Sequence, residues 1–229
     1  MTTIESRPVP TARAGDATEA FEQLAKRPAV VTVDLHRGHL DPTVATLPLP
    51  ADASAALVER AAPILARYRE VGVPVIHVIT SYRDRDEIVS NPFWRFHAGR
   101  PGSPRSAVAD HNLDWMPGLE LMPGIRGDGD KLVSTKKRYD CFVGTELGFL
   151  LRSGRHDAVL LLGVNTNSCV IATAIAASVR DYATFIVAEG VDTMLGQRLH
   201  EAALDVIDAS FGWVVSADAT LDVLRARAD

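Results

Sequence analysis

Three stretches of the chain carry side chains that can take part in covalent or proton-transfer chemistry. Each such side chain stands at the end of an apolar run or just after one: Asp34 ends AVVTVD, Cys169 follows LLLGVNTNS, and Lys136 and Lys137 end LVSTKK. A thiol attacks a carbonyl carbon when a base removes its proton, a carboxylate can be that base, and a nearby ammonium stabilises both anions. Together the three residue types predict a cysteine hydrolase, provided that folding brings them to one place.

Cys169 has the most specific setting of these residues. It follows a turn that contains Gly163, Asn165 and Asn167, and it begins an apolar stretch with helical periodicity. A helix N-terminus carries partial positive charge and free N–H groups, which favour a thiolate and can hold an oxyanion. The alternative is a cysteine that packs in the core as a small apolar side chain. Because a packed thiol does not need such a turn, the pattern favours a nucleophile.

Ordinary structural roles are open for the charged residues. An aspartate after a strand often caps the next turn, and charged residues at a strand end usually point to solvent, which is the default for at least one of Lys136 and Lys137. A lysine that reached back to the sheet edge would instead stabilise Asp34 and lower the pKa of Cys169.

Strands and helices alternate around these residues. Apolar runs predict strands over 29–34, 74–80, 132–135, 158–163, 183–190 and 212–216, and helical periodicity predicts helices over 18–26, 52–71, 145–152, 167–182 and 197–210. This alternation indicates an α/β fold of three α-β-α layers around a mostly parallel, six-stranded, Rossmann-like sheet. The carboxyl ends of its strands then share one edge, where α/β sheets bind ligands.

Gly72 and Pro63 affect the expected shape of the helix over 52–71. Gly72 predicts the end of this helix, and Pro63 inside it can introduce a kink. Separately, the chain is expected to divide into two parts. Residues 1–27 are expected to form an N-terminal extension, and residues 28–229 a single domain.

The three motifs together resemble the isochorismatase-like cysteine hydrolases, a family that includes nicotinamidase, N-carbamoylsarcosine amidase, ureidoacrylate amidohydrolase and biuret hydrolase. The resemblance rests on Asp34 in V-D-L, on KKRYDCFVGTEL and on GVNTNSCV, which span most of residues 28–216 in the family's order. The family's lysine motif, K-x-x-Y-[SD]-x-F-x-G-T-x-L, selects Lys136 rather than Lys137. The stretch DLHRGHLDP is most similar to the N-carbamoylsarcosine amidase-like branch.

The resemblance implies the isochorismatase-like hydrolase fold and a catalytic triad of Asp34, Lys136 and Cys169. In this triad Asp34 takes the proton of Cys169 and later passes it to the leaving amine, Lys136 holds both residues, and Cys169 forms a thioester that water hydrolyses. The resemblance also implies an oxyanion hole of backbone N–H groups at Cys169 and in the turn before it. A cis peptide bond is expected there, between Val164 and Asn165.

The activity that the resemblance implies is hydrolysis of a C–N bond in a small amide or carbamoyl (ureido) compound, with release of ammonia and without a cofactor. The alternatives are a vinyl-ether hydrolase of the isochorismatase type, which needs no thiol, and a catalytically silent binding protein. Asn165 replaces the threonine of most relatives, so its amide is a candidate substrate contact. Cys141, within the lysine motif, is expected to pack under the floor of the site.

Residues 81–130 show little periodicity and are rich in glycine, proline, arginine and aromatic residues. A loop of this length in a compact domain is usually functional. Aromatic side chains beside a crevice line small pockets, and an arginine can bind a substrate carboxylate through two hydrogen bonds. The alternatives are packing on a neighbouring subunit and surface salt bridges. The candidate substrate contacts are Tyr82, Phe93, Trp94, Arg95, Arg138 and His36.

His36 and His39 follow Asp34 at a spacing that suggests metal ligands. However, the segment SYRDRDEIVS lacks the histidine that nicotinamidase-type relatives carry after the second strand. We therefore expect structural roles for both histidines and no metal.

Bulk composition excludes some partners. A net charge of −5 gives no basic face for nucleic acid, and no apolar run reaches the roughly 20 residues that cross a bilayer. The N-terminus lacks the layout of a secretory signal, and Cys141 and Cys169 form no disulfide framework. These features predict a cytoplasmic protein. The family resemblance implies a homo-oligomer, a dimer or a tetramer.

Overall fold

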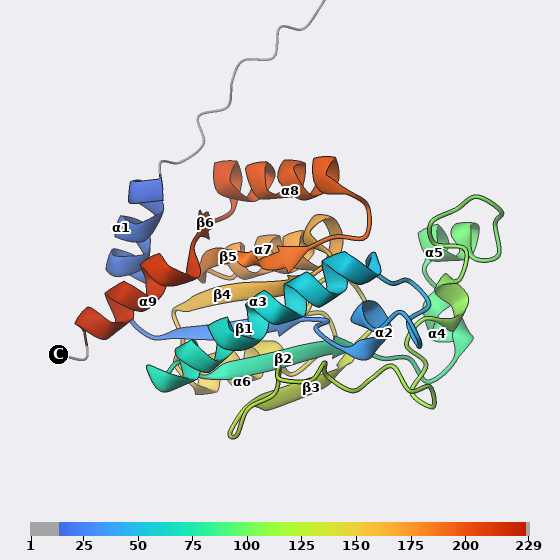
Figure 1. Ribbon diagram of the computed structural model, residues 1–229, viewed down its shortest axis with the longest axis horizontal. Helices are drawn as coiled ribbons and strands as arrows, with labels where there is room; N and C mark the ends of the chain where they lie inside the picture. The colour runs from blue at the N-terminus through green and yellow to red at the C-terminus, as the bar shows by residue number, and fades with distance from the viewer. Residues whose placement is uncertain (1–13, 228–229) are drawn as a thin grey trace, which may run out of the picture.

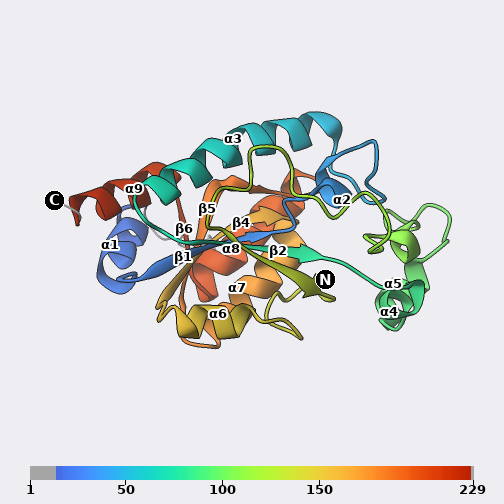
Figure 2. The same cartoon turned by 90° about the horizontal axis from the view of Figure 1, so that it is seen from below.

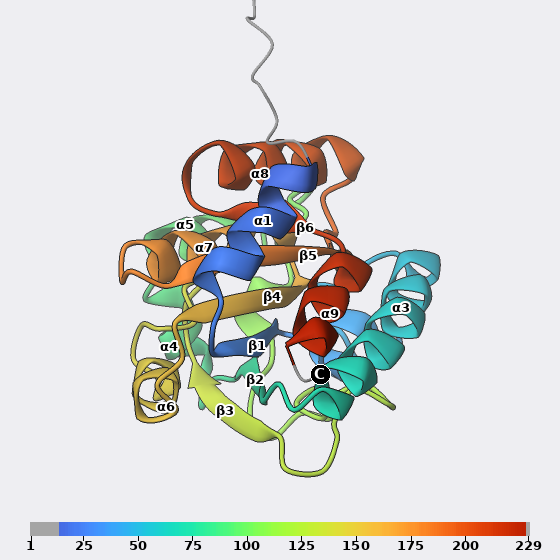
Figure 3. The same ribbon diagram turned by 90° about the vertical axis from the view of Figure 1, so that its left-hand side faces the viewer.

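A six-stranded sheet forms the centre of the computed structural model, which describes residues 14–227. All five neighbouring strand pairs are parallel, in the order β3-β2-β1-β4-β5-β6, and Figure 3 shows the strands stacked in this order. The strands are β1 (Pro28–Val33), β2 (Val75–Thr80), β3 (Lys131–Lys136), β4 (Ala158–Val164), β5 (Ala183–Asp192) and β6 (Trp213–Val215). The prediction of a three-layer fold around a parallel sheet is confirmed.

Helices cover both faces of the sheet (Figure 2). On one face, α1 (Ala14–Leu24), α3 (Ala51–Glu70) and α9 (Ala217–Ala226) pack on Val30, Leu160 and Phe185 of the strands. On the other face, α6 (Leu147–Ser153), α7 (Ile171–Ser178) and α8 (Gln197–Ser210) pack on Val31 and Leu161. Because β1 and β4 are buried on both faces, their sequences are apolar without alternation.

The predicted strands and helices are present, with small shifts of their ends. The α3 helix remains one continuous helix through Pro63, and it is followed by Gly72 at a φ of 76°, which suits glycine at a helix end. The helix expected over 167–182 begins instead as a π-helical segment, η2 (Thr166–Val170), and continues as α7. The C-terminal helix α9 was not expected.

Part of the predicted N-terminal extension, the helix α1, lies against the core. Residues 1–13 lie outside the described residues, but α1 packs into the core, where the ring of Phe21 meets Phe185 at 5.1 Å between centroids. Among the described residues, no helix is both long and apolar enough to span a membrane.

Residues 81–130 connect β2 to β3 and contain three short helices rather than one irregular loop. These are α4 (Arg85–Val89), α5 (Pro92–His97) and the 3₁₀ helix η1 (Val108–Asp110). The helices α4 and α5 lie beyond the carboxyl ends of the strands, together with α2 (Arg37–Leu40) (Figure 1). Residues 81–130 therefore form a wall over the carboxyl edge of the sheet, where Asp34, Lys136 and Cys169 lie.

Candidate active site

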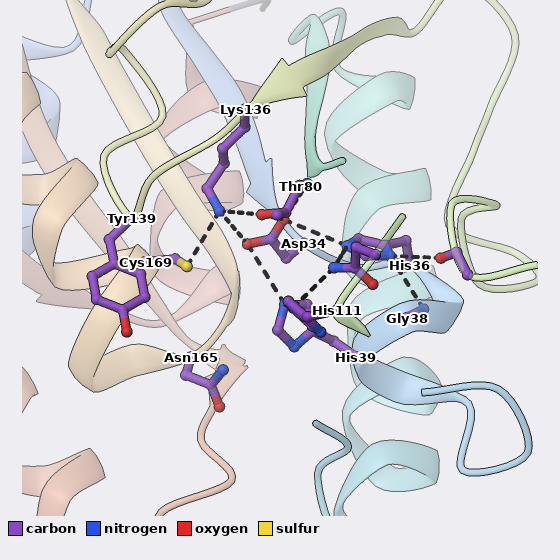
Figure 4. A network of polar contacts seen from close by, with 12 residues as sticks. Asp34, His36, Gly38, His39, Thr80, His111, Lys136, Tyr139, Asn165 and Cys169 are labelled. Atoms are coloured by element: carbon purple, nitrogen blue, oxygen red, sulfur yellow. Dashed lines mark hydrogen bonds and ion pairs between the residues drawn. The ribbon is translucent and has the colours of Figure 1, made fainter. Parts of the chain in front are cut away.

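The three side chains of the expected triad meet at the carboxyl edge of the sheet (Figure 4). Asp34 follows β1, Lys136 ends β3, and Cys169 lies in η2 after β4. The Nζ atom of Lys136 lies 2.6 Å from Asp34 Oδ2 and 3.3 Å from Cys169 Sγ. All three side chains are buried. The site therefore places a carboxylate, an ammonium and a thiol in direct contact.

Asp34 is held from two sides. Its Oδ1 atom accepts hydrogen bonds from the backbone N–H of Thr80 at 2.7 Å and from the Thr80 hydroxyl at 2.8 Å, while Oδ2 faces Lys136. The Thr80 hydroxyl in turn accepts a hydrogen bond from Lys136. Asp34 adopts a left-handed φ of 56°, a conformation that aspartate tolerates better than most residues. Sequence reasoning missed Thr80, which reaches the site because β2 pairs with β1.

Burial and charge act in opposite directions on the triad. Burial tends to raise the pKa of Asp34, but Lys136 and nearby imidazoles outweigh it and hold that pKa well below its usual value. Burial likewise tends to lower the pKa of Lys136, but Asp34 raises it well above its usual value. For Cys169 the effect of burial is larger than that of Lys136, so burial raises its pKa to about 11 although Lys136 opposes the change. The resting site is thus an ion pair beside a neutral thiol.

This result corrects one expectation from the sequence. The lysine does favour the thiolate, but the pKa of Cys169 is raised rather than lowered, because removal of the sulfur from water has the larger effect. A base must therefore take the thiol proton when the sulfur attacks.

The turn before Cys169 is tightly packed. At Gly163, φ is 126°, and a Cβ atom would lie 1.9 Å from the carbonyl oxygen of Val33, so no other residue fits there. The peptide bond between Val164 and Asn165 is cis, at the position that the resemblance implied. The carbonyl oxygen of Asn165 accepts hydrogen bonds from the N–H groups of Ser168 and Val170, which closes the turn.

The Asn165 side chain has a fixed orientation. Its Oδ1 atom accepts a hydrogen bond from the backbone N–H of Met194 at 2.8 Å and lies 3.4 Å from the Thr193 hydroxyl. An acceptor role for this oxygen assigns the other amide atom as nitrogen. Figure 4 shows the nitrogen turned toward the triad and the oxygen away from it. Asn165 lines the cavity that contains Cys169, so its Nδ2 group supplies a hydrogen-bond donor there.

Three histidines extend the polar network behind Asp34. His36 Nε2 lies 3.5 Å from Asp34 Oδ1, His39 Nε2 lies 4.0 Å from Oδ2, and His39 Nε2 lies 3.2 Å from His111 Nε2. Asn112 contributes Nδ2 at 3.0 Å from His111 Nε2 and 3.5 Å from His36 Nε2. Burial lowers the pKa of His39 to about 3 and that of His111 well below its usual value. Both imidazoles are therefore neutral.

Candidate metal-ligand atoms of Asp34, His36 and His39 lie within 4.8 Å of one another. Their present contacts suit a hydrogen-bond network better than a cation site. Both Asp34 oxygens already accept hydrogen bonds, and the ammonium of Lys136 at 2.6 Å would repel a cation. His36 Nδ1 lies 2.7 Å from the carbonyl oxygen of Gly118. The expectation of no metal remains a prediction.

An inner cavity of about 30 Å³ adjoins the triad. Of the predicted substrate contacts, Tyr82, Trp94, Arg138 and Asn165 line it, and Phe93 lines an adjacent outer cavity of about 540 Å³. His36 is buried behind Asp34 and Arg95 donates to the carbonyl oxygen of Val89, so both lie away from these cavities. Sequence reasoning missed other lining residues of the inner cavity, which include His39, Arg105, His111, Tyr139 and Met194.

Cys141 is fully buried in the core cluster that also contains Cys169, and burial raises its pKa. It lines neither cavity. A packing role agrees with this position.

A parallel sheet that joins Asp34, Lys136 and Cys169 at its carboxyl edge is the arrangement that the resemblance in the sequence implied. A family model described as an isochorismatase domain matches residues 28–219, and the chain belongs to this family.

Two curated relatives and two solved structures illustrate the similarity. Maleamate amidohydrolase of Pseudomonas putida is 28% identical over 87% of this chain and 88% of its own length. Ureidoacrylate amidohydrolase RutB of Methylorubrum extorquens is 26% identical over 93% of this chain and 84% of its own length. A cysteine hydrolase from Pseudomonas syringae pv. phaseolicola superposes with a TM-score of 0.71 at 20% identity, over 89% of this chain and 97% of the other. N-carbamoylsarcosine amidase from Thermoplasma acidophilum superposes with a TM-score of 0.61 at 24% identity, over 84% of this chain and 97% of the other. At these identities the two structures support the fold alone.

Proposed function

We propose that this protein is a cysteine hydrolase that cleaves the C–N bond of a small amide or carbamoyl (ureido) compound and releases ammonia. One observation carries the proposal: the Lys136 ammonium touches both Asp34 and Cys169 beside a cavity that Cys169 lines. The names of the two curated relatives, both amidohydrolases, support the same bond type.

In the proposed reaction, Asp34 accepts the thiol proton while Cys169 Sγ attacks the carbonyl carbon. The carbonyl π electrons move to oxygen, and backbone N–H groups of Asn165 and Cys169 stabilise the oxyanion. The C–N bond then breaks, and Asp34 returns its proton to the leaving nitrogen, which departs as ammonia. Water, deprotonated by Asp34, hydrolyses the thioester and restores the thiol. Throughout, Lys136 offsets negative charge on the carboxylate and on the sulfur.

The raised pKa of Cys169 fits this scheme. At neutral pH a thiol with a pKa of about 11 is only about one part in 10⁴ thiolate. At neutral pH such a thiol ionises mainly when Asp34 receives its proton, so proton transfer and attack by the sulfur are coupled. The buried ion pair keeps Asp34 deprotonated and ready for that transfer.

A screen for ammonia release tests the proposal. We expect the full-length protein to release ammonia from at least one class among primary amides and ureido acids, and we expect no hydrolysis of esters or vinyl ethers. Cys169→Ala should lose at least about three orders of magnitude in rate, as expected when a nucleophile is removed. Incubation of the wild-type enzyme with a substrate and rapid acid quenching should leave an acyl group on the Cys169 peptide. Failure of every amide and ureide to yield ammonia would overturn the proposal.

The same experiments separate the alternatives. A vinyl-ether hydrolase that needs no thiol would survive alkylation by iodoacetamide, whereas the proposed enzyme would not. A catalytically silent binding protein would form no adduct at Cys169 with any substrate.

We also propose a homo-oligomer and a cytoplasmic location. Phe93 and Phe96 on α5 are 52% and 60% exposed in the single chain, which suits burial against another copy. Light scattering coupled to size-exclusion chromatography tests the first proposal, with a monomer as the contradicting result. Cell fractionation tests the second.

A further inference from the structure

The inner and outer cavities meet at Arg105, Tyr139 and Ser168, which line both. The inner cavity has a volume of about 30 Å³, against about 540 Å³ for the outer cavity. On this measure one water molecule needs about 10–15 Å³, so the inner cavity has room for a small planar group such as a carboxamide and little more. A substrate with its reacting carbon at Cys169 must therefore extend past these three residues. The group that follows the amide lies next to Arg105.

The charge around both cavities is positive. Lys136, Arg105 and Arg138 are among the lining residues, and no aspartate or glutamate of residues 14–227 lines either cavity. This local excess of cations is opposite in sign to the chain's net charge of −5. Lys136 is already paired with Asp34, so the two arginines carry the uncompensated charge.

The two arginines differ in their contacts. Arg138 donates hydrogen bonds to the carbonyl oxygens of Glu87 and Lys137 and to the Ser90 hydroxyl, so structural contacts hold it in place. The guanidinium of Arg105 has no hydrogen bond or ion pair with any residue between 14 and 227, and it lies over the Tyr139 ring, 5.8 Å from the centroid. A half-buried guanidinium without an acceptor loses hydration that a ligand anion can replace.

We propose that the substrate carries a carboxylate beyond its reacting amide, and that Arg105 binds this carboxylate where the two cavities meet. The proposal rests on the proposed hydrolase function for its substrate, but the anion site itself does not depend on turnover. Arg105 is then a specificity residue: it selects amides and ureides with an anionic end over neutral ones.

Protection of Cys169 from alkylation tests the anion site without any reaction of a substrate. The probes are malonate, succinate and glutarate, with the corresponding neutral diamides as controls, at constant ionic strength. Iodoacetamide labelling is followed by peptide mass spectrometry, which separates Cys169 from Cys141. We expect at least one dicarboxylate to slow labelling of Cys169 and its diamide to have a weaker effect.

Arg105→Gln should abolish this protection, and Arg105→Lys should retain part of it. Arg100→Gln is the matched control, because Arg100 lies on the same loop, contacts the Phe96 ring and lines neither cavity. The proposal is overturned if no dicarboxylate slows the labelling of Cys169, or if the diamides slow it equally. It is also overturned if a dicarboxylate slows labelling as much in Arg105→Gln as in the wild type.

Kinetics separate this proposal from the hydrolase function. With the monoamides of the same three acids, Arg105→Gln should raise KM about 10- to 100-fold, the loss expected for hydrogen bonds to a charged group, with a smaller change in kcat. Equal kcat/KM for a monoamide and its methyl ester would refute the anion site and leave the hydrolase intact. Protection that depends on Arg105, without ammonia from any amide or ureide, would refute the hydrolase and leave the anion site intact.

Discussion

Lys136 places its Nζ atom 3.3 Å from the Sγ atom of Cys169, yet the thiol remains harder to ionise than a thiol in water. The same ammonium lies 2.6 Å from the Asp34 carboxylate, and the negative charge of that carboxylate offsets much of the effect of the ammonium on the thiol. The lysine therefore stabilises the anionic base more than the nucleophile, and this division of its charge leads to a specific pH dependence.

The rate of Cys169 alkylation should rise with pH up to about 11, the value to which burial raises the pKa of this thiol. The sign follows because only the thiolate reacts and the thiolate fraction grows tenfold per pH unit below the pKa. Labelling with iodoacetamide over a series of pH values measures this profile. A plateau already reached near neutral pH would contradict it.

Replacement of Lys136 should be far more damaging than replacement of its neighbour Lys137. Lys136→Gln leaves the buried Asp34 carboxylate without a cation, which typically costs about 3–5 kcal/mol of stability, and it should remove nearly all activity. The side chain of Lys137 is 31% exposed and lies 3.2 Å from Glu87, so Lys137→Gln should cost about 1 kcal/mol or less. Denaturant unfolding and ammonia release measure both effects.

A double variant separates loss of charge balance from loss of packing. Asp34→Asn/Lys136→Gln contains no unpaired buried charge, so it should be more stable than Lys136→Gln although it is equally inactive. If the stability lost in the double variant equals the sum of the losses in Asp34→Asn and Lys136→Gln, the two side chains are not coupled.

Cys141 and Cys169 should behave differently although both are buried. Cys141→Ala should keep most of the activity, because Cys141 lines neither cavity, and should lose only the stability of a small packed side chain, on the order of 1 kcal/mol. Steady-state kinetics and thermal unfolding of the variant check this. A loss of activity comparable to that of Cys169→Ala would contradict the packing role.

Asn165→Asp should preserve the turn but weaken substrate binding. The remaining oxygen can still accept the hydrogen bond from Met194, while the donor that faces the cavity becomes an anionic acceptor. We expect an increase in KM of about 10-fold or more, consistent with loss of one hydrogen bond and added repulsion. Asn167→Asp, which adds the same charge beside the outer cavity, is the control and should have a smaller effect. Equal effects would argue against a specific role for Asn165.

Activity should not depend on a metal. Chelator treatment should leave the rate of ammonia release unchanged, and elemental analysis should find no stoichiometric metal, since Asp34 is committed to Lys136 and Thr80. Stoichiometric zinc whose removal stops turnover would contradict this.

The sequence predicts which strand-end residues reach the site far better than it predicts which residues of the wall, 81–130, line the cavities. Asp34, Lys136 and Cys169 each end or follow a recognisable strand, and parallel strands share their carboxyl edge. Thr80 also ends a strand, but its role depends on β2 lying beside β1, which local pattern does not specify. The contact between His39 and His111 joins positions 72 residues apart, and no periodicity links them.

Arg105 illustrates the same difficulty within residues 81–130. Five arginines of this segment precede Gly118, and only the folded path of the chain between α5 and η1 brings Arg105 rather than Arg95 to the cavities. Helix α9 was missed for a simpler reason. Its signals are Ser216 as N-cap and an apolar stripe with Leu221, and they directly follow a strand of three residues, so the local pattern does not separate the helix clearly from that strand.

The groups proposed to carry out bond cleavage come from strand ends, whereas Tyr82, Trp94, Arg105 and His111 come from the single crossover between β2 and β3. Mutations in that crossover can therefore change which molecule is accepted while the reacting groups remain in place. Grafting residues 81–130 from a relative of different substrate preference is accordingly a rational route to a new specificity in this scaffold.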